Sequence, residues 1–485
     1  MNIEHNNEKI WHICDEMREG FHTSESKTRI LALLMLKYLS ENAVDGKVGT
    51  LTVPDQSSFE SLFDKRDADD LSHYIDTALR AIEQGNQETV SDAISSIIFD
   101  DSSLGDHKKR NEILRTMIIE LNSPGLNFRK NDFNYAGSAF EFGLAKFADI
   151  EKKHVDFTPL NISDLIAELA KHNVISTIHD PTCGTGMLLI KTANANGSND
   201  IQLSGQELDE TNRAIATMNA IVHGYDSCDF RLGNTLLNPQ FTNENALQKF
   251  SCIVSFPPLI QKDWTQDDTK EYDVQHDPFN RFRRGIPPHK RSDWAFLSHI
   301  IESLDDHGRA YVIVPQGVLY RSSSAESQIR TYFIKEQLIE AIINLPTNTL
   351  HGTYIAPAIM ILAKNNRKKS ILFIDAASKF KKEKFRNVIG DHEIKDIASI
   401  YHDYISGNES NTLKMKNAYV ATLEEIMEHD YSLSMTEYAK HDDDNATLDL
   451  GEIRRKIALK QEEYHAIQKE RIALMKTLEK RLNNS

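Results

Sequence analysis

Beyond Pro159 the chain alternates between short apolar segments and longer amphipathic ones, and this alternation constrains the fold more than any other feature. Short apolar runs rich in β-branched residues are typical of strands, whereas apolar residues three or four positions apart are typical of helices. The expected strands cover residues 174–179, 201–207, 251–255, 309–314, 338–345, 356–363 and 371–375. Helices are expected at 161–171, 211–223 and 292–304. Because strands that alternate with helices form a largely parallel sheet with crossovers on both faces, the sequence predicts an α/β fold.

The first 130 residues follow a different pattern. Apolar residues recur there at helical spacing and strand signals are scarce. One such series is Trp11, Cys14, Met17 and Phe21. A breaker cluster at 122–125 closes this region, and a short helix is expected at 137–147. We therefore predict an N-terminal helical domain at 1–130, followed by an α/β core with its C-terminal elaboration at 131–445.

The last segment, 446–485, is predicted to be a separate long amphipathic helix. It is rich in Glu and Lys, and two series with seven-residue spacing start at Ile453 and Ile457. Such a helix can fold back on its own domain or dock on a helix of a partner. The length and terminal position of the helix favour docking on a helix of a partner.

Cysteine usage and hydropathy exclude several classes of protein. The four cysteines make no Cys-x-x-Cys pair, so neither a disulfide framework nor a metal site is expected. They are Cys14, Cys183, Cys228 and Cys252. The most apolar run, 30–36, is far shorter than the ~18 residues that a membrane span needs, and the N-terminus lacks the order of a signal peptide. We expect a cytoplasmic protein without a membrane partner.

The formal net charge of −16 argues against a surface that wraps nucleic acid on all sides. Any contact with phosphate must be local, and the chain has two local concentrations of basic residues. The first comprises Arg281, Arg283, Arg284, His289, Lys290 and Arg291, and the second comprises Lys379, Lys381, Lys382, Lys384 and Arg386. Charge runs are usually solvated faces, so both interpretations stay open for each cluster.

A loop at 180–186 has the composition of a ligand-binding turn. Gly184 and Gly186 allow a tight turn after a predicted strand and let backbone N–H groups approach a ligand, while Asp180 can bind an ammonium or a hydroxyl. Glu207 lies 21 residues beyond Gly186, the spacing at which an acidic residue binds the ribose of an adenosine cofactor. The alternative is a structural turn with an incidental Glu.

Several motifs together resemble a known family. The sequence contains Phe157-Thr158-Pro159, Asp180-Pro181-Thr182-Cys183-Gly184-Thr185-Gly186, Gly205-Gln206-Glu207, Gly233-Asn234-Thr235-Leu236 and Ser255-Phe256-Pro257-Pro258-Leu259. Their order is similar to that of the motifs in the adenine-N6 DNA methyltransferase subunit, or modification subunit, of type I restriction–modification systems. Further similarity at 292–296, 308–319, 343–346, 373–376 and 431–434, and at 11–41, extends the resemblance over nearly the whole chain.

The resemblance implies a Rossmann-like methyltransferase core that binds S-adenosylmethionine. It places Thr158 and Asp180 near the methionine moiety, Glu207 on the ribose and Asn234 beside the adenine, where the family usually has Asp. The cofactor-binding residues that it implies are Phe157, Thr158, Pro159, Asp180, Thr182, Gly184, Thr185, Gly186, Glu207, Asn234 and Thr235. Asn can still accept a hydrogen bond from an adenine amino group, so the change at 234 weakens this contact without abolishing it.

The pentad at 255–259 departs from the family pattern, which is Asn-Pro-Pro-aromatic. An enzyme of this kind flips the adenine out of the helix, and the Asn accepts a hydrogen bond from its amine while the aromatic ring stacks on the base. Here Phe256 replaces the Asn and Leu259 the aromatic residue. Loss of one aligned polar group, at roughly 2.7–4 kcal/mol, slows such a reaction on the order of a hundred- to a thousandfold.

Two routes could restore activity. Phe256 could stack on the base in a shifted register, or Ser255 could accept the hydrogen bond. Cys252 is no substitute nucleophile for cytosine chemistry, because it lacks the Pro-Cys context of such enzymes, and a buried core thiol is expected.

The resemblance also implies partners. The chain has no additional segment of about 100–150 residues that could select a DNA sequence, and the family uses a separate specificity subunit. DNA, that subunit, a second copy of this chain and a restriction subunit are the expected partners. The basic cluster at 281–291 follows the pentad, where a loop at the carboxyl edge of the sheet could contact DNA phosphate.

Two functions remain from the sequence. The first is an active adenine-N6 modification subunit, and the second is a catalytically silent relative that acts as a structural or DNA-sensing subunit of a restriction or phage-defence complex. A methyltransferase for small molecules or proteins is a weaker alternative, since the resemblance outside the core is to a DNA-modifying subunit.

Overall fold

The computed structural model describes most of the chain up to Tyr438. The described residues are 11, 23–90, 93–102, 105–123, 126–129, 135–151, 158–171, 175–197, 200–244, 246–259, 263–265, 272–350, 353–366, 368–383, 386–408 and 417–438. Residues 1–438 form one compact unit. The helix predicted at 446–485 and the series after Trp11 lie outside the described residues.

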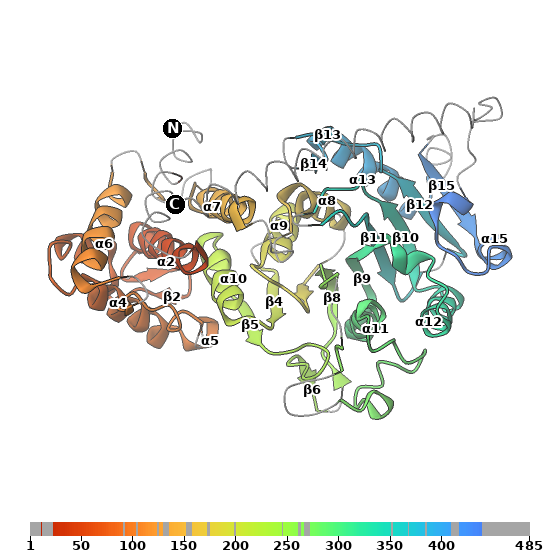
Figure 1. Cartoon of the computed structure of the whole chain (residues 1–485), viewed down its shortest axis with the longest axis horizontal. Coiled ribbons are helices and arrows are strands. Elements are labelled where there is room, and N and C mark those ends of the chain that lie inside the picture. The colour runs from red at the N-terminus through yellow and green to blue at the C-terminus, as the bar shows by residue number, and fades with distance from the viewer. Residues whose placement is uncertain are drawn as a thin grey trace, which may run out of the picture. The chain divides into compact units, whose positions relative to one another are not determined.

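A sheet of nine strands forms the centre of this unit (Figure 1), with the order β15-β12-β10-β11-β9-β8-β3-β4-β5. The strands are β3 (Thr177–Asp180), β4 (Gln202–Glu207), β5 (Cys228–Leu232), β8 (Phe250–Ser255), β9 (Leu304–Pro315), β10 (Ile339–Asn344), β11 (Pro357–Ala363), β12 (Ser370–Asp375) and β15 (Ala418–Thr422). Five of the eight neighbouring pairs are parallel, and the pairs β9–β11, β10–β11 and β12–β15 are antiparallel. The predicted α/β fold with a largely parallel sheet is confirmed.

Helices cover both faces of the sheet because each central strand is apolar on both sides. In β9, Tyr311 and Ile313 belong to one apolar cluster, while Val312 and Val314 belong to another. The first cluster includes side chains of α8 (Leu160–Ala170), α9 (Met187–Asn196) and α13 (Asp391–Ile405). The second includes side chains of α11 (Asp293–Ser303), α12 (Ser324–Lys335) and α15 (Leu423–Glu428). The strand alternation thus separates two cores.

Every strand predicted from the sequence is present, with ends shifted by a few residues. The three predicted helices correspond to α8, α10 (Glu210–Val222) and α11. Strands β5 and β15, at the two edges of the sheet, and the crossover helices α9, α12 and α13 were not predicted from the sequence.

The N-terminal region is helical, as predicted, apart from a small hairpin of β1 (Lys47–Val48) and β2 (Leu51–Thr52). Its helices are α2 (Thr23–Asn42), α3 (Phe59–Asp64), α4 (Leu71–Gly85), α5 (Gln87–Val90), α6 (His107–Leu121) and α7 (Tyr135–Glu151), which contains the predicted helix at 137–147. Residues 30–36 of α2 are all buried, because α2 lies at the centre of this group of helices. None of the helices in the described part of the chain is long and apolar enough to cross a membrane.

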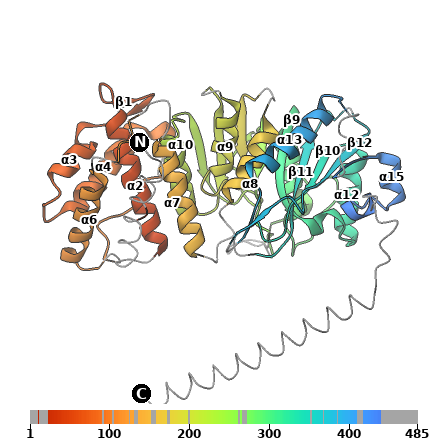
Figure 2. The ribbon, with the colours of Figure 1, turned by 90° about the horizontal axis from the view of Figure 1, so that it is seen from above.

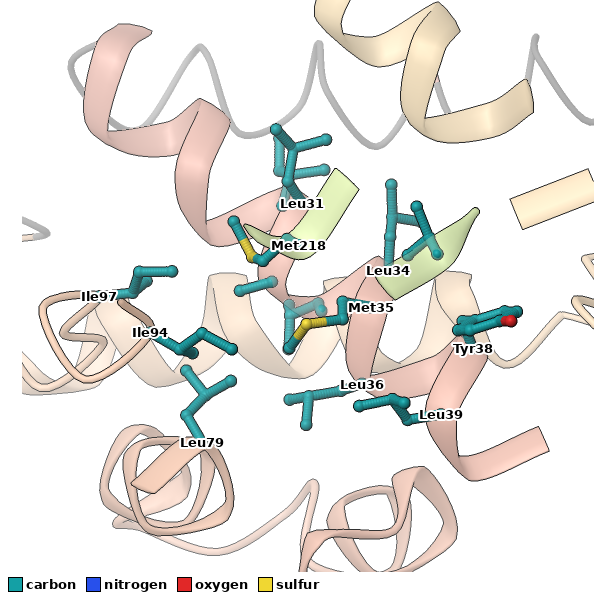
Figure 3. Close-up of a cluster of buried hydrophobic side chains, with 14 of the residues drawn as sticks. Leu31, Leu34, Met35, Leu36, Tyr38, Leu39, Leu79, Ile94, Ile97 and Met218 are labelled. Carbon is teal, nitrogen blue, oxygen red and sulfur yellow. The ribbon is translucent and has the colours of Figure 1, made fainter. Parts of the chain in front are cut away.

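Helix α10 joins the N-terminal helices to the sheet. Its residues Ala214, Ile215, Met218, Ile221 and Val222 belong to the apolar cluster of the N-terminal helices, whereas Ala216 and Ala220 belong to a cluster of the sheet. Figure 3 shows the Met218 side chain next to Leu31 of α2. Figure 2 shows α2, α7 and α10 side by side. The N-terminal helices and the sheet are therefore connected through one two-faced helix.

A polar contact reinforces this connection. The backbone N–H of Thr50, in the β1–β2 hairpin, donates to the Asp226 carboxylate at 2.6 Å, and the Thr89 hydroxyl donates to the Asp226 carbonyl at 3.1 Å. A Cβ atom at Gly49 would lie 2.3 Å from an Asp226 carboxylate oxygen, and Gly49 has a positive φ of 59°. Only glycine therefore fits this turn without displacement of the Asp226 carboxylate.

We predict that Met218→Ala lowers the free energy of unfolding by about 2–5 kcal/mol, because it leaves a cavity where three helices meet. The matched control is Met427→Ala, whose side chain is 53% exposed and for which we expect a change within about 0.5 kcal/mol. Urea unfolding followed by circular dichroism measures both. Equal effects of the two variants would contradict the role assigned to α10.

Candidate functional site

The strand order reverses beside β3, and this reversal positions the candidate site. β4 and β5 lie on one side of β3, and β8 and β9 lie on the other. In open α/β sheets, ligands bind outside the carboxyl ends of the strands at such a reversal. Asp180 ends β3, Glu207 ends β4 and Ser255 ends β8, so the structure brings three residues singled out from the sequence to this edge.

The loop at 180–186 is a tight turn that starts α9. The backbone N–H of Thr182 donates to Asp180 Oδ1 at 2.9 Å, and Gly184 and Gly186 have positive φ angles of 53° and 76°. A Cβ atom at Gly186 would lie 3.3 Å from the Ala216 Cβ of α10, which is tighter than an ordinary contact. The two glycines therefore serve both the turn and the approach of α10.

The Asp180 carboxyl group is buried at the end of β3, with the residue 1% exposed. Burial raises its pKa to about 7, and the nearby Glu207 charge acts in the same direction. Hydrogen bonds from Thr182 and Ser255 oppose this shift. An acid whose pKa lies this far above its usual range is a candidate for contact with a cationic ligand group.

Glu207 connects β4 to the loop at 180–186. Its Oε2 accepts a hydrogen bond from the Gly184 N–H at 2.8 Å, and its Oε1 accepts one from the Asp209 N–H at 2.9 Å. Burial raises the Glu207 pKa, while these hydrogen bonds lower it. Each carboxylate oxygen has a second lone pair, so both can also accept from hydroxyls of a ligand.

Gly205 allows the loop to pack closely on β4. A Cβ atom there would lie 2.7 Å from the Cys183 Cβ and 2.9 Å from a ring carbon of Phe230. Any larger residue would displace Cys183 and the loop with it.

The sequence analysis did not identify the role of Gln206. This side chain is buried, accepts from the Gln240 N–H at 3.0 Å and donates to the Asn238 carbonyl at 3.0 Å. It thereby holds the segment 233–240 beside the loop at 180–186. The signal that could have revealed it is a polar residue inside an otherwise buried strand.

The same segment contains Asn234 and Thr235. Asn234 Oδ1 accepts from the backbone N–H groups of Leu236 at 3.0 Å and Leu237 at 3.2 Å, which forms a turn stabilised by its own side chain. The Thr235 hydroxyl donates to the Pro181 carbonyl. The structure therefore places both residues beside the 180–186 loop, with the Asn234 oxygen already engaged.

The pentad lies against this loop. The Ser255 hydroxyl is 2.9 Å from the Thr182 hydroxyl and is completely buried. Phe256 is half-buried and packs against the apolar cluster of the sheet. Pro257 is buried, Pro258 is exposed and Leu259 is half-buried. Cys252, the third residue of β8, is buried as predicted, and burial raises its pKa to about 12.

The remaining predicted site residues are Phe157, Thr158, Pro159 and Thr185. Thr158 is buried next to Pro159, which caps α8, and Phe157 lies outside the described residues. The Thr185 carbonyl accepts a hydrogen bond from the Asn219 amide of α10 at 2.9 Å.

For two residues of the first basic cluster, the predicted contact with DNA phosphate is inconsistent with their burial. The Arg281 guanidinium is completely buried and donates to Asp277 at 2.7 Å and to the Leu236 carbonyl at 2.8 Å. Arg284 is also buried and is paired with Glu302 and Glu336. The sequence pattern recorded their charge but not the acidic partners that the fold supplies.

Arg281 has a structural role instead, since it links the segment 277–281 to the segment that carries Asn234 and Thr235. The other four residues of the cluster, Arg283, His289, Lys290 and Arg291, are exposed, although Arg283 is paired with Glu302 and Arg291 with Glu326. Contact with phosphate stays a prediction for Arg283, Lys290 and Arg291.

Comparison with known proteins agrees with this geometry. Residues 131–446 match the N-6 DNA methylase family, and residues 6–121 match the HsdM N-terminal domain. The chain belongs to the modification subunits of type I restriction–modification systems. It is 27% identical to the methylase subunit of the type I restriction enzyme MpnII of Mycoplasma pneumoniae, over 91% of this chain and 90% of that protein. It is 30% identical to the MjaVIII methylase subunit of Methanocaldococcus jannaschii, over 70% of this chain and 59% of that protein.

A solved structure shows the same fold. The type I methyltransferase subunit from Streptococcus thermophilus has a TM-score of 0.79 and 24% identity, and the match covers 90% of this chain and 100% of that one. A second solved structure comes from work on the complex assembly and conformational transition of a type I system. Its chain has a TM-score of 0.67 and 16% identity, and the match covers 98% of this chain and 99% of that one. The predicted family and fold are thereby confirmed.

We predict that Asp180→Asn stabilises the protein at pH 8 by about 1–4 kcal/mol and has little effect near pH 4. With a pKa of about 7, folded Asp180 keeps its proton while the unfolded chain loses it near pH 4. The stability of the unaltered protein therefore falls between about pH 4 and 7, whereas the Asn variant lacks this contribution. Denaturant unfolding at pH 4, 6 and 8 measures the difference, and a pH-independent difference would contradict the raised pKa.

Proposed function

We propose that this chain is the modification subunit of a type I DNA restriction–modification or phage-defence complex, which binds S-adenosylmethionine and DNA together with a specificity subunit for adenine-N6 methylation. We further propose that Phe256 and Leu259 impair its catalysis. One observation carries the proposal. The 255–259 pentad begins at the end of β8, hydrogen-bonded to the candidate cofactor loop, and Phe256 occupies the position at which the family pattern has the Asn acceptor.

The residues at this edge fit S-adenosylmethionine, which when bound supplies an activated methyl group. The Asp180 carboxyl group can pair with the ammonium of the methionine moiety, and the Glu207 oxygens can accept from the ribose hydroxyls. Leu208 and Leu232, at the ends of β4 and β5, are 63% and 43% exposed and offer apolar contact to an adenine ring. Gly184 and Gly186 allow the tight turn of the loop, and Gly205 lets the loop pack closely on β4.

The proposed catalytic impairment rests on the pentad itself. Neither Phe256 nor Leu259 has a side-chain acceptor, so only backbone carbonyls remain to accept from the adenine amine. Leu259 also lacks an aromatic face for the flipped base. The adenine amine is therefore neither polarised nor held as firmly as in the family pattern.

The surroundings of the pentad disfavour both routes to restored activity. The Ser255 hydroxyl is fully buried and engaged with Thr182, so it is not free to accept from a base. Phe256 is partly committed to packing against the core of the sheet, which limits its movement toward a shifted base. Both observations support reduced turnover.

The partners follow from the family. The structure with a TM-score of 0.67 comes from work on the assembly of a type I system, and the match covers 98% of this chain. We propose that this chain assembles in the same manner with a specificity subunit and a second copy of itself, and with a restriction subunit where one is encoded. The cytoplasm is the compartment in which such a complex meets DNA.

The alternative function is a catalytically silent subunit that keeps the fold, the partner contacts and cofactor binding, and that acts as a structural or DNA-sensing component of a defence complex. The intact loop at 180–186 beside an altered pentad favours this alternative. The two functions share every partner and differ only in turnover.

We predict that the double reversion Phe256→Asn with Leu259→Phe raises methyl transfer about a hundredfold or more, because it restores one aligned acceptor and a stacking face. Tritiated methyl transfer to cognate DNA measures this rate in the complex with the specificity subunit. The control is Leu259→Phe alone, which supplies the ring without the acceptor and should gain less than about tenfold. If the unaltered chain already turns over as fast as the double variant, the impairment is refuted.

We predict that the unaltered chain binds S-adenosylmethionine and that Glu207→Ala weakens binding about 10- to 100-fold, because hydrogen bonds to a charged group are lost. Glu210→Ala is the matched control, since it removes the same charge from an exposed position three residues away. Isothermal titration calorimetry measures the affinities, and thermal melting establishes that each variant is folded. Absence of binding by the unaltered chain, or equal affinities for both variants, would refute the cofactor assignment.

A further inference from the structure

Four of the five residues of the second basic cluster, Lys379, Lys381, Lys382 and Arg386, lie in a small hairpin whose location the proposed function does not explain. Strands β13 (Lys381–Lys382) and β14 (Asn387–Val388) pair in antiparallel register, and the Glu383 N–H donates to the Arg386 carbonyl at 2.9 Å across the turn. We call residues 379–383 and 386–388 the basic hairpin. The segment 379–386 has five basic residues and one acidic residue in a chain whose net charge is −16.

The basic hairpin lies at the same edge of the sheet as the candidate site. It follows β12, which is parallel to β10, and the carboxyl ends of these strands pair through Asn344 and Asp375. Two hydrogen bonds fix it to the loop after β10. Asn387 donates from its backbone N–H to the Asn348 carbonyl at 2.8 Å and from its side chain to the Thr347 carbonyl at 2.7 Å. The hairpin is thus anchored to this edge.

Two ammonium groups of the hairpin are available to a ligand. Lys379 is paired with Asp396 of α13 at 4.0 Å, which offsets its charge. Lys381 and Lys382 are exposed and form no ion pair within the described residues. Neighbouring residues of a strand point to opposite faces, so these two lysines extend from both sides of a narrow ribbon. A two-stranded ribbon fits the major groove of DNA, where such lysines reach the phosphates on either side.

Three exposed aromatic residues belong to loops at this edge of the sheet. Tyr320, after β9, is 55% exposed, and Tyr354, before β11, is 86% exposed. Phe380, beside the two lysines, is 40% exposed. The Ala356 carbonyl accepts from the Gln316 N–H at 3.0 Å, which places the segment after Tyr354 against the end of β9. Rings alternating with basic groups are typical of surfaces that contact nucleic acid.

We propose that the basic hairpin contacts the backbone phosphates of DNA through Lys381 and Lys382, at a distance from the target base. This inference rests on the proposed function, because it assumes that the pentad edge faces DNA. The hairpin follows β12, which is the fourth strand from β8 in the sheet. At the usual strand spacing, β12 lies about 19 Å from β8. A duplex that lies along this edge meets the hairpin roughly five or six base pairs from the flipped base. The hairpin therefore supplies sequence-independent affinity and leaves base readout to the specificity subunit.

The test compares Lys381→Gln/Lys382→Gln with a matched pair, Lys108→Gln/Lys109→Gln, which are adjacent exposed lysines of α6 in the N-terminal region. Each full-length chain is assembled with its specificity subunit, and the affinity for a labelled non-cognate duplex is measured by fluorescence anisotropy between about 50 and 200 mM salt. We expect the hairpin variant to reduce the slope of log affinity against log salt by about two and to weaken binding roughly tenfold at 100 mM. The α6 variant should change the slope by less than about half a unit.

The outcomes separate this inference from the proposed function. If the unaltered complex binds duplex and the hairpin variant keeps its salt slope, the hairpin inference is overturned and the proposed function stands. Equal losses in the two variants would also overturn it, because they would show a general effect of net charge. If the unaltered complex binds no duplex, the proposed function fails, and the inference fails with it. The melting temperatures of both variants are also measured. Values equal to that of the unaltered chain establish that the fold is intact.

Discussion

The contact between the ends of β3 and β8 is the interaction on which the rest of the site depends. The hydroxyls of Thr182 and Ser255 lie 2.9 Å apart, and the Thr182 backbone N–H also donates to Asp180. This contact joins the loop at 180–186 to the pentad at the point where the strand order reverses. Any movement of one motif therefore moves the other. The position of Phe256 relative to the loop at 180–186 follows from this contact.

Further side chains extend this junction outward. Gln206 holds the segment 233–240 from the side of β4, and Arg281 holds it from the side of the loop before α11. Both are buried polar groups with several partners, and such groups are costly to leave unpaired. They act as positioning residues. The segment 233–240 is thus held from two sides by buried polar side chains.

Much of the fold and part of the site could be predicted from the sequence. β11 and residues 310–315 of β9 are buried on both faces, so their apolar runs are continuous and easily recognised. The edge strand β5 carries Asp229 and Arg231 and lacks such a run, which explains why it was missed. The loop at 180–186 and Glu207 were recognisable because their spacing reflects local turn geometry.

The roles of Arg281 and Gln206 were not recognisable. They depend on partners such as Asp277 and Asn238, and a pattern of charge or hydropathy does not show which groups the fold brings within hydrogen-bond distance.

Helix α10 belongs to two apolar cores at once. One face of it completes the core of the N-terminal helices and another packs on the sheet, so a fragment that begins after the N-terminal helices would expose a wide apolar stripe to water. A cut between the N-terminal helices and the sheet therefore divides one apolar core, and an exchange of the N-terminal helices must preserve the face of α10 that completes this core.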